Sequence, residues 1–547
     1  MQFLRRIPES LLVWAVAALG SLSFLLLGPY SNYGPAGFLD PWFYTGYFTN
    51  LSYLVRHFGP TYIGSRLPWI LPGVAAFRFA SPEPASVFLN FAIVIVSAVA
   101  LYWAVRWYYG QPAGAMASVL LVTNPYFMST VCWDYPDGPA IAYAFAALAF
   151  TVRPNGPRVR NTVLAGAFLA LSGLTNMSGA PMILAVAAIP LLRERASIRV
   201  MARECVYLGA GAAAVTLALC PVSQLIFGRW TYFYWQVYRA FHTFENPEFL
   251  AAMWGTGNAF LFHSPRLIAP ALLIALAPVY LRRGRKPYPI GMFAFVSLAV
   301  CLALYAFQEF VLHGAALRVP YHSSYMVVPL LFFAGVSLGE CSISQSEAAV
   351  AGAVAVGMTF TFLYVGSPKD PSLMIFAAVG LALVTFVPLR LPVSAVLLAV
   401  LMFLSPALDG TLKYAWNRPV PVDGRNVDVF RNLMTLQSAL KAAVDPARKV
   451  RFWFDRDEPT ARFFDSADGL YLWVDPDWRT QLAKGEQPPS DATLVHLTTH
   501  PERMAERTQL LASRGIHVGN ERRWTMPYGA YTVHVILQDV MPAGSSQ

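Results

Sequence analysis

Long apolar segments recur through most of this 547-residue chain, and they restrict its fold more than any other feature. They cover residues 11–27, 87–105, 113–128, 139–152, 163–174, 180–192, 206–227, 267–281, 290–312, 326–338, 348–365, 373–387 and 391–404. Such segments leave no polar face for water, so the lipid bilayer is their natural solvent. Composition agrees, because 13% of the residues are charged, against about 25% in soluble proteins. The sequence therefore predicts a polytopic α-helical membrane protein with about thirteen transmembrane helices and excludes a soluble enzyme.

Two alternatives concern individual segments. Several are shorter than the about 20 residues that a perpendicular helix needs, and residues 163–174 and 180–192 are alternatively re-entrant. The first segment follows Arg5 and Arg6, so a cleaved signal peptide is an alternative there, although no A-x-A cleavage site follows it.

The basic excess of the chain lies in its apolar part. Residues 1–407 hold 23 Lys and Arg against 13 Asp and Glu, whereas residues 409–547 hold 17 of each. With the N-terminus inside, 15 of the 23 basic residues fall on inner loops, in agreement with the positive-inside rule. We therefore predict a cytoplasmic N-terminus, an outer C-terminus and no nucleic-acid partner. The preference for Arg over Lys, 34 to 6, is typical of a GC-rich bacterial genome, which predicts a bacterial inner membrane with the C-terminal part in the periplasm.

Two regions on the predicted outer side are too long to be simple connections, namely the first outer loop, residues 28–86, and the tail from Asp409; a third, residues 228–266, is intermediate. The tail combines strand-like runs at 450–454, 470–474, 493–498 and 531–537 with a helical run at 501–514 that Gly515 closes. We expect a membrane domain at residues 1–408 and a soluble α/β domain at residues 409–547. The five cysteines show no CxxC spacing, which argues against a disulfide framework and a cysteine metal site.

The first outer loop contains a candidate acid at the start of an aromatic helix. Asp40 precedes Pro41, and apolar residues, among them Tyr44, recur at helical spacing between residues 44 and 58. This pattern predicts an amphipathic helix that lies in the lipid headgroup layer. The simplest role for Asp40 is an N-cap with Pro41 at the first helical position, and a functional role is the alternative.

Further charged residues lie in the first two outer loops. Arg66 stands between a Gly-Ser turn and a Trp-bearing apolar stretch, where a guanidinium either binds a phosphate through two hydrogen bonds or only contacts lipid headgroups. Asp134 and Asp137 lie three residues apart before the fourth segment. One of them is alternatively part of a Pro-Asp-Gly turn. Because ionisable groups at a membrane boundary cost free energy, a functional site is the default hypothesis for this pair.

A later outer loop supplies Arg318, His322 and Tyr325 shortly before Pro329. Histidine binds metal ions or accepts protons, and a lone histidine alternatively only forms hydrogen bonds.

Taken in order along the chain, three of these features resemble one family. They are an Asp in a long first outer loop (Asp40), an Asp before Gly-Pro at the start of the fourth segment (Asp137), and a Tyr-x-x-x-Pro sequence that starts at Tyr325. The arrangement, with many spans and a terminal outer domain, resembles the C-type glycosyltransferases of the protein O-mannosyltransferase and lipid A aminoarabinose transferase kind. The resemblance rests on order and sidedness, since none of these motifs is specific by itself.

The resemblance implies an inverting glycosyltransferase that moves a sugar from a polyprenyl-phosphate carrier to an acceptor hydroxyl at the outer membrane face. The acceptor is a lipid, a protein or a glycan. It implies that Asp40 and Asp137 are catalytic, with Asp40 as the base. The other implied roles are donor phosphate binding by Arg66 and Arg318, and positioning of the acceptor or substrate by Asp134, Tyr44, His322 and Tyr325. A divalent metal ion is left open as a cofactor.

Two positions depart from the family pattern. Pro41 follows Asp40 where many relatives have a second acid, and residues 174–179 lack the Lys-Gly-like step that relatives often carry after the fifth span. The substrate class therefore stays open.

The main alternative is a transporter or flippase for a lipid-linked glycan. A transporter is expected to show internal repeats and charged residues near the middle of its spans, whereas here Glu309 is the main ionisable residue inside a predicted span. A membrane anchor that presents the tail is a third class, and it leaves the outer-loop acids unexplained. The sequence contains no Walker motif and no GxGxxG followed by the acidic residue of a dinucleotide fold, in agreement with a donor that is not a nucleotide.

Overall fold

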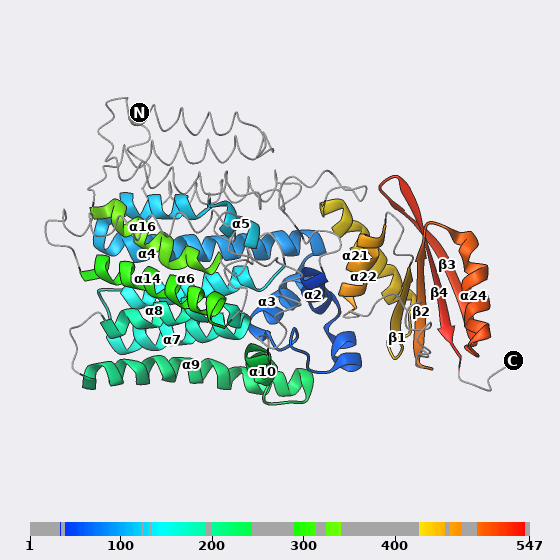
Figure 1. The fold of residues 1–547 in the computed structure, drawn as a ribbon, viewed down its shortest axis with the longest axis horizontal. Helices are drawn as coiled ribbons and strands as arrows, with labels where there is room; N and C mark the ends of the chain where they lie inside the picture. Colours follow the sequence, from blue (N-terminus) through cyan, green and yellow to red (C-terminus); the bar gives the residue numbers. More distant parts are fainter. Residues whose placement is uncertain are drawn as a thin grey trace, which may run out of the picture.

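The computed structural model describes residues 33, 39–122, 124–131, 134–192, 198–242, 289–312, 324–340, 426–454, 460–471 and 490–541. These residues form a bundle of apolar helices and, beside one end of it, a group of helices and strands from the C-terminal part of the chain (Figure 1). The predicted domain boundary at Asp409 lies outside the described residues, as do the predicted spans at 11–27, 267–281, 348–365, 373–387 and 391–404.

The other predicted spans are helical. The helices of the bundle are α4 (Pro82–Val122), α5 (Pro125–Val131), α6 (Asp137–Val152), α7 (Arg158–Thr175), α8 (Ala180–Leu192), α9 (Ile198–Phe227), α14 (Pro289–Phe310) and α16 (Val327–Glu340). Within the described part of the chain, three helices, in α4, α9 and α14, are long and apolar enough to cross a membrane by length and composition. The chain is therefore a helical membrane protein with several membrane-length helices.

Contacts between helices give their relative directions. α4 reverses at Gly110, whose φ of 80° favours glycine, and Ser118 Oγ then donates to the Ala98 carbonyl over 2.8 Å, so its two halves are antiparallel. The first half contains the span predicted at 87–105, whereas the span predicted at 113–128 is divided between the second half, which ends at Val122, and α5. α6 and α7 are also antiparallel, since Ser172 Oγ donates to the Ala140 carbonyl over 2.8 Å.

α7 and α9 run parallel, side by side (Figure 1). Near one end of α7, Arg158 Nε lies 2.8 Å from Glu204 Oε1 of α9, and further along a Cβ at Gly166 would lie 2.0 Å from the Leu208 carbonyl oxygen. At the other end of α7, Asn176 contacts Asp137 of α6. The helix thus runs from one end of the bundle to the other, which argues against the re-entrant alternative for residues 163–174.

The C-terminal part contains a four-stranded mixed sheet. Its elements are α21 (Asn426–Ala443), β1 (Lys449–Phe454), α22 (Ala461–Leu470), β2 (Ala492–Thr498), α24 (Met504–Ser513), β3 (Val518–Tyr528) and β4 (Tyr531–Val540). The strand order is β1-β2-β4-β3, with β1 parallel to β2 and the other pairs antiparallel. The sheet lies between α21 and α22 on one side and α24 on the other (Figure 1).

The predicted strands at 450–454, 493–498 and 531–537 are confirmed, and α24 with the short 3-10 helix η6 (Pro501–Arg503) matches the predicted helical run. The strand predicted to start at Leu470 is wrong there, because Leu470 is the last residue of α22; residues 472–474 lie outside the described residues. β3 escaped prediction because one of its faces is mostly polar and exposed, including Glu521, so it lacks the apolar content of a strand buried on both faces.

The aromatic helix predicted in the first outer loop exists as α2 (Leu39–Phe58), and its first half is buried in protein. Residues 41–48 are all buried, and Trp42 is 1% exposed. A Cβ at Gly46 would lie 2.3 Å from the Leu470 carbonyl oxygen, and the Val450 N–H donates to Tyr53 Oη over 2.7 Å. The first half of α2 therefore packs against protein on all sides, including the C-terminal part, and its placement in the headgroup layer stays a prediction. The spacing of apolar residues predicts which face of a helix is buried, but it does not predict whether lipid or protein covers that face.

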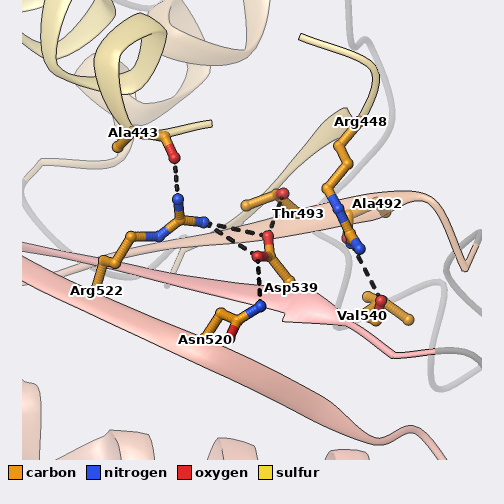
Figure 2. Close-up of polar contacts among 8 residues, drawn as sticks. All are labelled: Ala443, Arg448, Ala492, Thr493, Asn520, Arg522, Asp539 and Val540. Atoms are coloured by element: carbon orange, nitrogen blue, oxygen red, sulfur yellow. Dashed lines mark hydrogen bonds and ion pairs between the residues drawn. The ribbon is translucent and has the colours of Figure 1, made fainter. Parts of the chain in front are cut away.

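A polar cluster joins α21 to the edge of the sheet (Figure 2). Arg522 donates to the Ala443 carbonyl at the end of α21 and to both oxygens of Asp539, at 3.2 and 3.3 Å. Asp539 also accepts from Thr493 Oγ1 over 2.7 Å and from Asn520 Nδ2 over 3.4 Å. One carboxylate therefore joins β2, β3 and β4, and its cationic partner caps a helix.

We expect Asp539→Ala to lower the free energy of unfolding of this part by about 1–3 kcal/mol, because it removes the acceptor of several donors. The measurement is urea-dependent proteolysis of the detergent-solubilised full chain. Glu502→Ala is the control, since that exposed carboxylate contacts only the exposed His500 and should leave the midpoint unchanged. An unchanged urea midpoint for Asp539→Ala would contradict a stabilising role for the cluster.

Candidate active site

Arg66 is a buried cation held by tyrosine hydroxyls. It directly precedes α3 (Leu67–Phe79) and is 4% exposed. One terminal nitrogen donates to Tyr44 Oη, the other donates to Tyr62 Oη, and the guanidinium carbon lies 4.5 Å from the centre of the Tyr62 ring. Nε has no hydrogen-bond partner, and no carboxylate of the described residues forms an ion pair with this side chain. A buried guanidinium in this state is a strong site for an anion.

Asp137, at the start of α6, is a fully buried acid whose charge acts on Arg66. Its Oδ1 accepts from Asn176 Nδ2 over 2.7 Å and from the hydroxyl of Tyr325, which lies in the 3-10 helix η5 (Ser324–Met326). Its Oδ2 has no hydrogen-bond partner. One oxygen is thus fixed by the protein and the other is available to a ligand hydroxyl.

Asp40 differs from these two residues because it is exposed. It lies in the first turn of α2, where the helix dipole favours a negative charge. The hydroxyl of Tyr135 donates to its Oδ2 over 3.0 Å, and the Tyr135 ring meets the Tyr44 ring edge-on at 5.8 Å. The predicted N-cap role for Asp40 is wrong, because α2 starts at Leu39 and Asp40 lies inside its first turn.

These side chains form one electrostatic group. The charges of Arg66, Asp40 and Asp137 all act on the Tyr44 hydroxyl, and those of Arg66 and Asp40 act on Asp137. Transfer of a group from a phosphate carrier to an alcohol requires three kinds of side chain. They are a cation that binds the phosphate, an exposed carboxylate that accepts the proton of the alcohol, and a buried carboxylate that accepts a hydrogen bond from a ligand hydroxyl.

Asp134 lies apart from this chemistry. Its Oδ1 accepts from Ser86 Oγ over 2.7 Å and its Oδ2 from Thr45 Oγ1 over 3.2 Å, so both oxygens are occupied by residues of α4 and α2. Burial raises the pKa of Asp134 to about 6, although both hydrogen bonds act in the opposite direction. This geometry favours a link between two helices over the predicted contact with the acceptor.

Tyr44 and Tyr325, predicted to position the acceptor or substrate, contact Arg66 and Asp137, respectively. The sequence analysis missed Tyr62, Tyr135 and Asn176, the partners of the three charged groups. For Asn176 a signal existed, because it stands in the segment 174–179 that departs from the family pattern. Arg318 and His322 lie outside the described residues. Among the residues that the structure describes, no three His, Cys, Asp or Glu side chains gather as they would around a metal ion.

Part of the chain matches a known protein family, and several solved structures are similar to the chain. Residues 66–226 match the model of the family described as dolichyl-phosphate-mannose-protein mannosyltransferase. No curated protein matches the chain. Among solved structures the chain is similar to ArnT from Cupriavidus metallidurans in the apo state, with 15% identity, a TM-score of 0.49 and coverage of 96% of this chain and 97% of that one.

The same ArnT bound to undecaprenyl phosphate gives 15% identity, a TM-score of 0.48 and the same coverage, 96% and 97%. The oligosaccharyltransferase of Archaeoglobus fulgidus in complex with zinc and sulfate gives 11% identity, a TM-score of 0.44 and coverage of 95% and 72%. At such values the structural similarity carries no correspondence between residues. The family match begins at Arg66 and runs through both buried carboxylates, so this part of the chain is similar to membrane glycosyltransferases that use lipid-phosphate sugar donors.

Proposed function

We propose that the protein transfers a sugar, with inversion, from a polyprenyl-phosphate carrier to an acceptor hydroxyl at the outer face of a bacterial inner membrane. The observation that carries the proposal is the buried guanidinium of Arg66, which has two tyrosine hydroxyls as partners and no paired carboxylate among the described residues. A phosphate would supply the missing charge and accept hydrogen bonds from the guanidinium. In this arrangement residues 409–547 form a domain in the periplasm.

In the proposed reaction Asp40 takes the proton of the acceptor hydroxyl, and its exposure leaves it open to that acceptor. The acceptor oxygen bonds to the anomeric carbon on the side opposite the carrier, which inverts the configuration. The bond from that carbon to the phosphate oxygen breaks, and its electron pair stays on the phosphate. Arg66 stabilises the negative charge that develops on the phosphate, and Oδ2 of Asp137 accepts a hydrogen bond from a hydroxyl of the sugar or acceptor.

The proposal is tested with purified protein in lipid nanodiscs, a polyprenyl-phosphate sugar and candidate lipid, peptide or glycan acceptors. We expect acceptor-dependent release of polyprenyl phosphate and a product whose anomeric configuration, measured by NMR, is opposite to that of the donor. The flippase alternative is examined in sealed vesicles with a labelled lipid-linked sugar. Movement of the lipid across the bilayer without release of the sugar would overturn the proposal.

A further inference from the structure

Gln236 is a buried amide that the reaction above does not use. It lies in the short helix α10 (Tyr234–His242), which stands near the end of the bundle where α7 ends (Figure 1). Its neighbours Tyr234 and Val237 are 54% and 40% exposed, whereas Gln236 is 2% exposed. Gln236 is thus the inward-facing polar residue of a helix whose neighbouring side chains face outward.

Both amide hydrogens of Gln236 have backbone acceptors in two distant segments. Nε2 donates to the Ser65 carbonyl over 3.0 Å and to the Leu174 carbonyl over 2.7 Å. Ser65 immediately precedes Arg66, and Leu174 lies two residues before Asn176, the donor to Asp137. A single side chain therefore joins the backbone that carries the guanidinium to the backbone that orients the buried acid.

The other backbone hydrogen bonds of residues 65–67 are made within the same loop, with the carbonyls of residues 61, 63 and 65 as acceptors. The tyrosine partners of Arg66, Tyr44 and Tyr62, come from the same outer loop, so they hold the side chain within that loop. The contact from Gln236 is instead made to the backbone and comes from the third outer region of the chain. A guanidinium misplaced by about 1 Å loses much of its effect on a phosphate, which is why the position of this backbone matters.

We propose that Gln236 is a positioning residue for the donor phosphate: it fixes the Ser65–Arg66 backbone against the end of α7 so that the guanidinium meets the carrier phosphate. The inference rests on the proposed function, because it assigns that phosphate to Arg66. Gln236 itself does not touch the reacting atoms. Its loss affects donor binding more than acceptor binding or the chemical step.

The test compares Gln236→Leu and Gln236→Glu with wild type at pH 8. Leu keeps the volume but has no donor, and Glu keeps the shape but donates at most one hydrogen bond, when it is protonated. Two neutral hydrogen bonds are worth together about tenfold in affinity. We expect the KM for the polyprenyl-phosphate sugar to rise about tenfold, while the acceptor KM and kcat change less than twofold. Val237→Ala, at the next and exposed position of α10, is the matched control and should match wild type.

Binding of polyprenyl phosphate alone, measured by tryptophan fluorescence titration of the full chain in nanodiscs, separates the possible failures. If wild type does not bind it, the proposed function fails. If wild type binds and both Gln236 variants bind equally well, only the positioning role fails. A lower kcat or a higher acceptor KM with an unchanged donor KM overturns it as well. If Gln236→Leu does not fold, Gln236→Glu alone decides, since it preserves the shape of the side chain.

Discussion

Asp40→Asn is expected to lower the kcat/KM of sugar transfer about 10²- to 10⁴-fold, the contribution of a general base. The amide has nearly the same shape as the carboxylate and still accepts the hydrogen bond from Tyr135, but it cannot take the proton of the acceptor hydroxyl. Binding of the polyprenyl-phosphate sugar should be nearly unchanged, because Arg66 and its tyrosines are untouched. The variant thus separates the chemical step from donor binding.

The measurement is the steady-state rate of polyprenyl phosphate release as a function of acceptor concentration at saturating donor, with donor binding determined separately. Asp491→Asn, an exposed acid next to the first residue of β2, is the matched control and should retain wild-type turnover. Full turnover of Asp40→Asn would exclude this residue as the base. Asp137→Asn would then be measured in the same way. Full turnover of both variants would contradict the assignment of these two acids to the active site.

Arg66→Gln is expected to lower kcat/KM about 10²- to 10³-fold, the usual effect of removing one strong electrostatic contact to a developing negative charge. Most of the loss should appear as weaker donor binding, because the guanidinium already meets the phosphate in the ground state. Arg66→Lys should restore only part of the activity. An ammonium keeps the charge but cannot hold the two tyrosine hydroxyls and a phosphate in the planar geometry of a guanidinium.

Donor saturation curves and direct titration with polyprenyl phosphate measure this effect. Arg78→Gln is the control, because this exposed arginine lies in the last turn of the same helix α3. An unchanged donor saturation curve for Arg66→Gln would remove Arg66 from the donor site. Equal affinity for a polyprenyl phosphate and for the uncharged polyprenol would do the same, since the guanidinium is assigned to the phosphate.

The helices were largely predictable because each depends on neighbours along the chain. Apolar runs such as 139–152 and 206–227 are helices in the structure, and Gly515, with φ of 71°, ends α24 as its place in the sequence predicts. Helix reversals followed from the same reasoning, since the breaks between apolar runs fall where the chain turns. The exception is β3, whose polar outer face hides it from a pattern based on apolar residues.

The candidate site was predictable in its charged residues and not in their partners. The cost of charge at a membrane boundary pointed to Asp134 and Asp137, and the family resemblance implied roles for Asp40 and Arg66 and a catalytic role for Asp137 but not for Asp134. The structure shows how the contacts of these two acids differ. Asp134 uses both oxygens to join α2 and α4, whereas Asp137 keeps one oxygen without a partner beside Arg66.

Composition and the spacing of apolar runs by themselves determined that this chain is a helical membrane protein with a C-terminal part of mixed helix and strand, since local burial patterns dictate both. Tertiary structure decided which groups meet. Tyr325 reaches Asp137 across 188 positions and Gln236 reaches Ser65 across 171, and α2 packs on α22. Such contacts depend on how whole helices pack, and no periodicity within one helix contains that information.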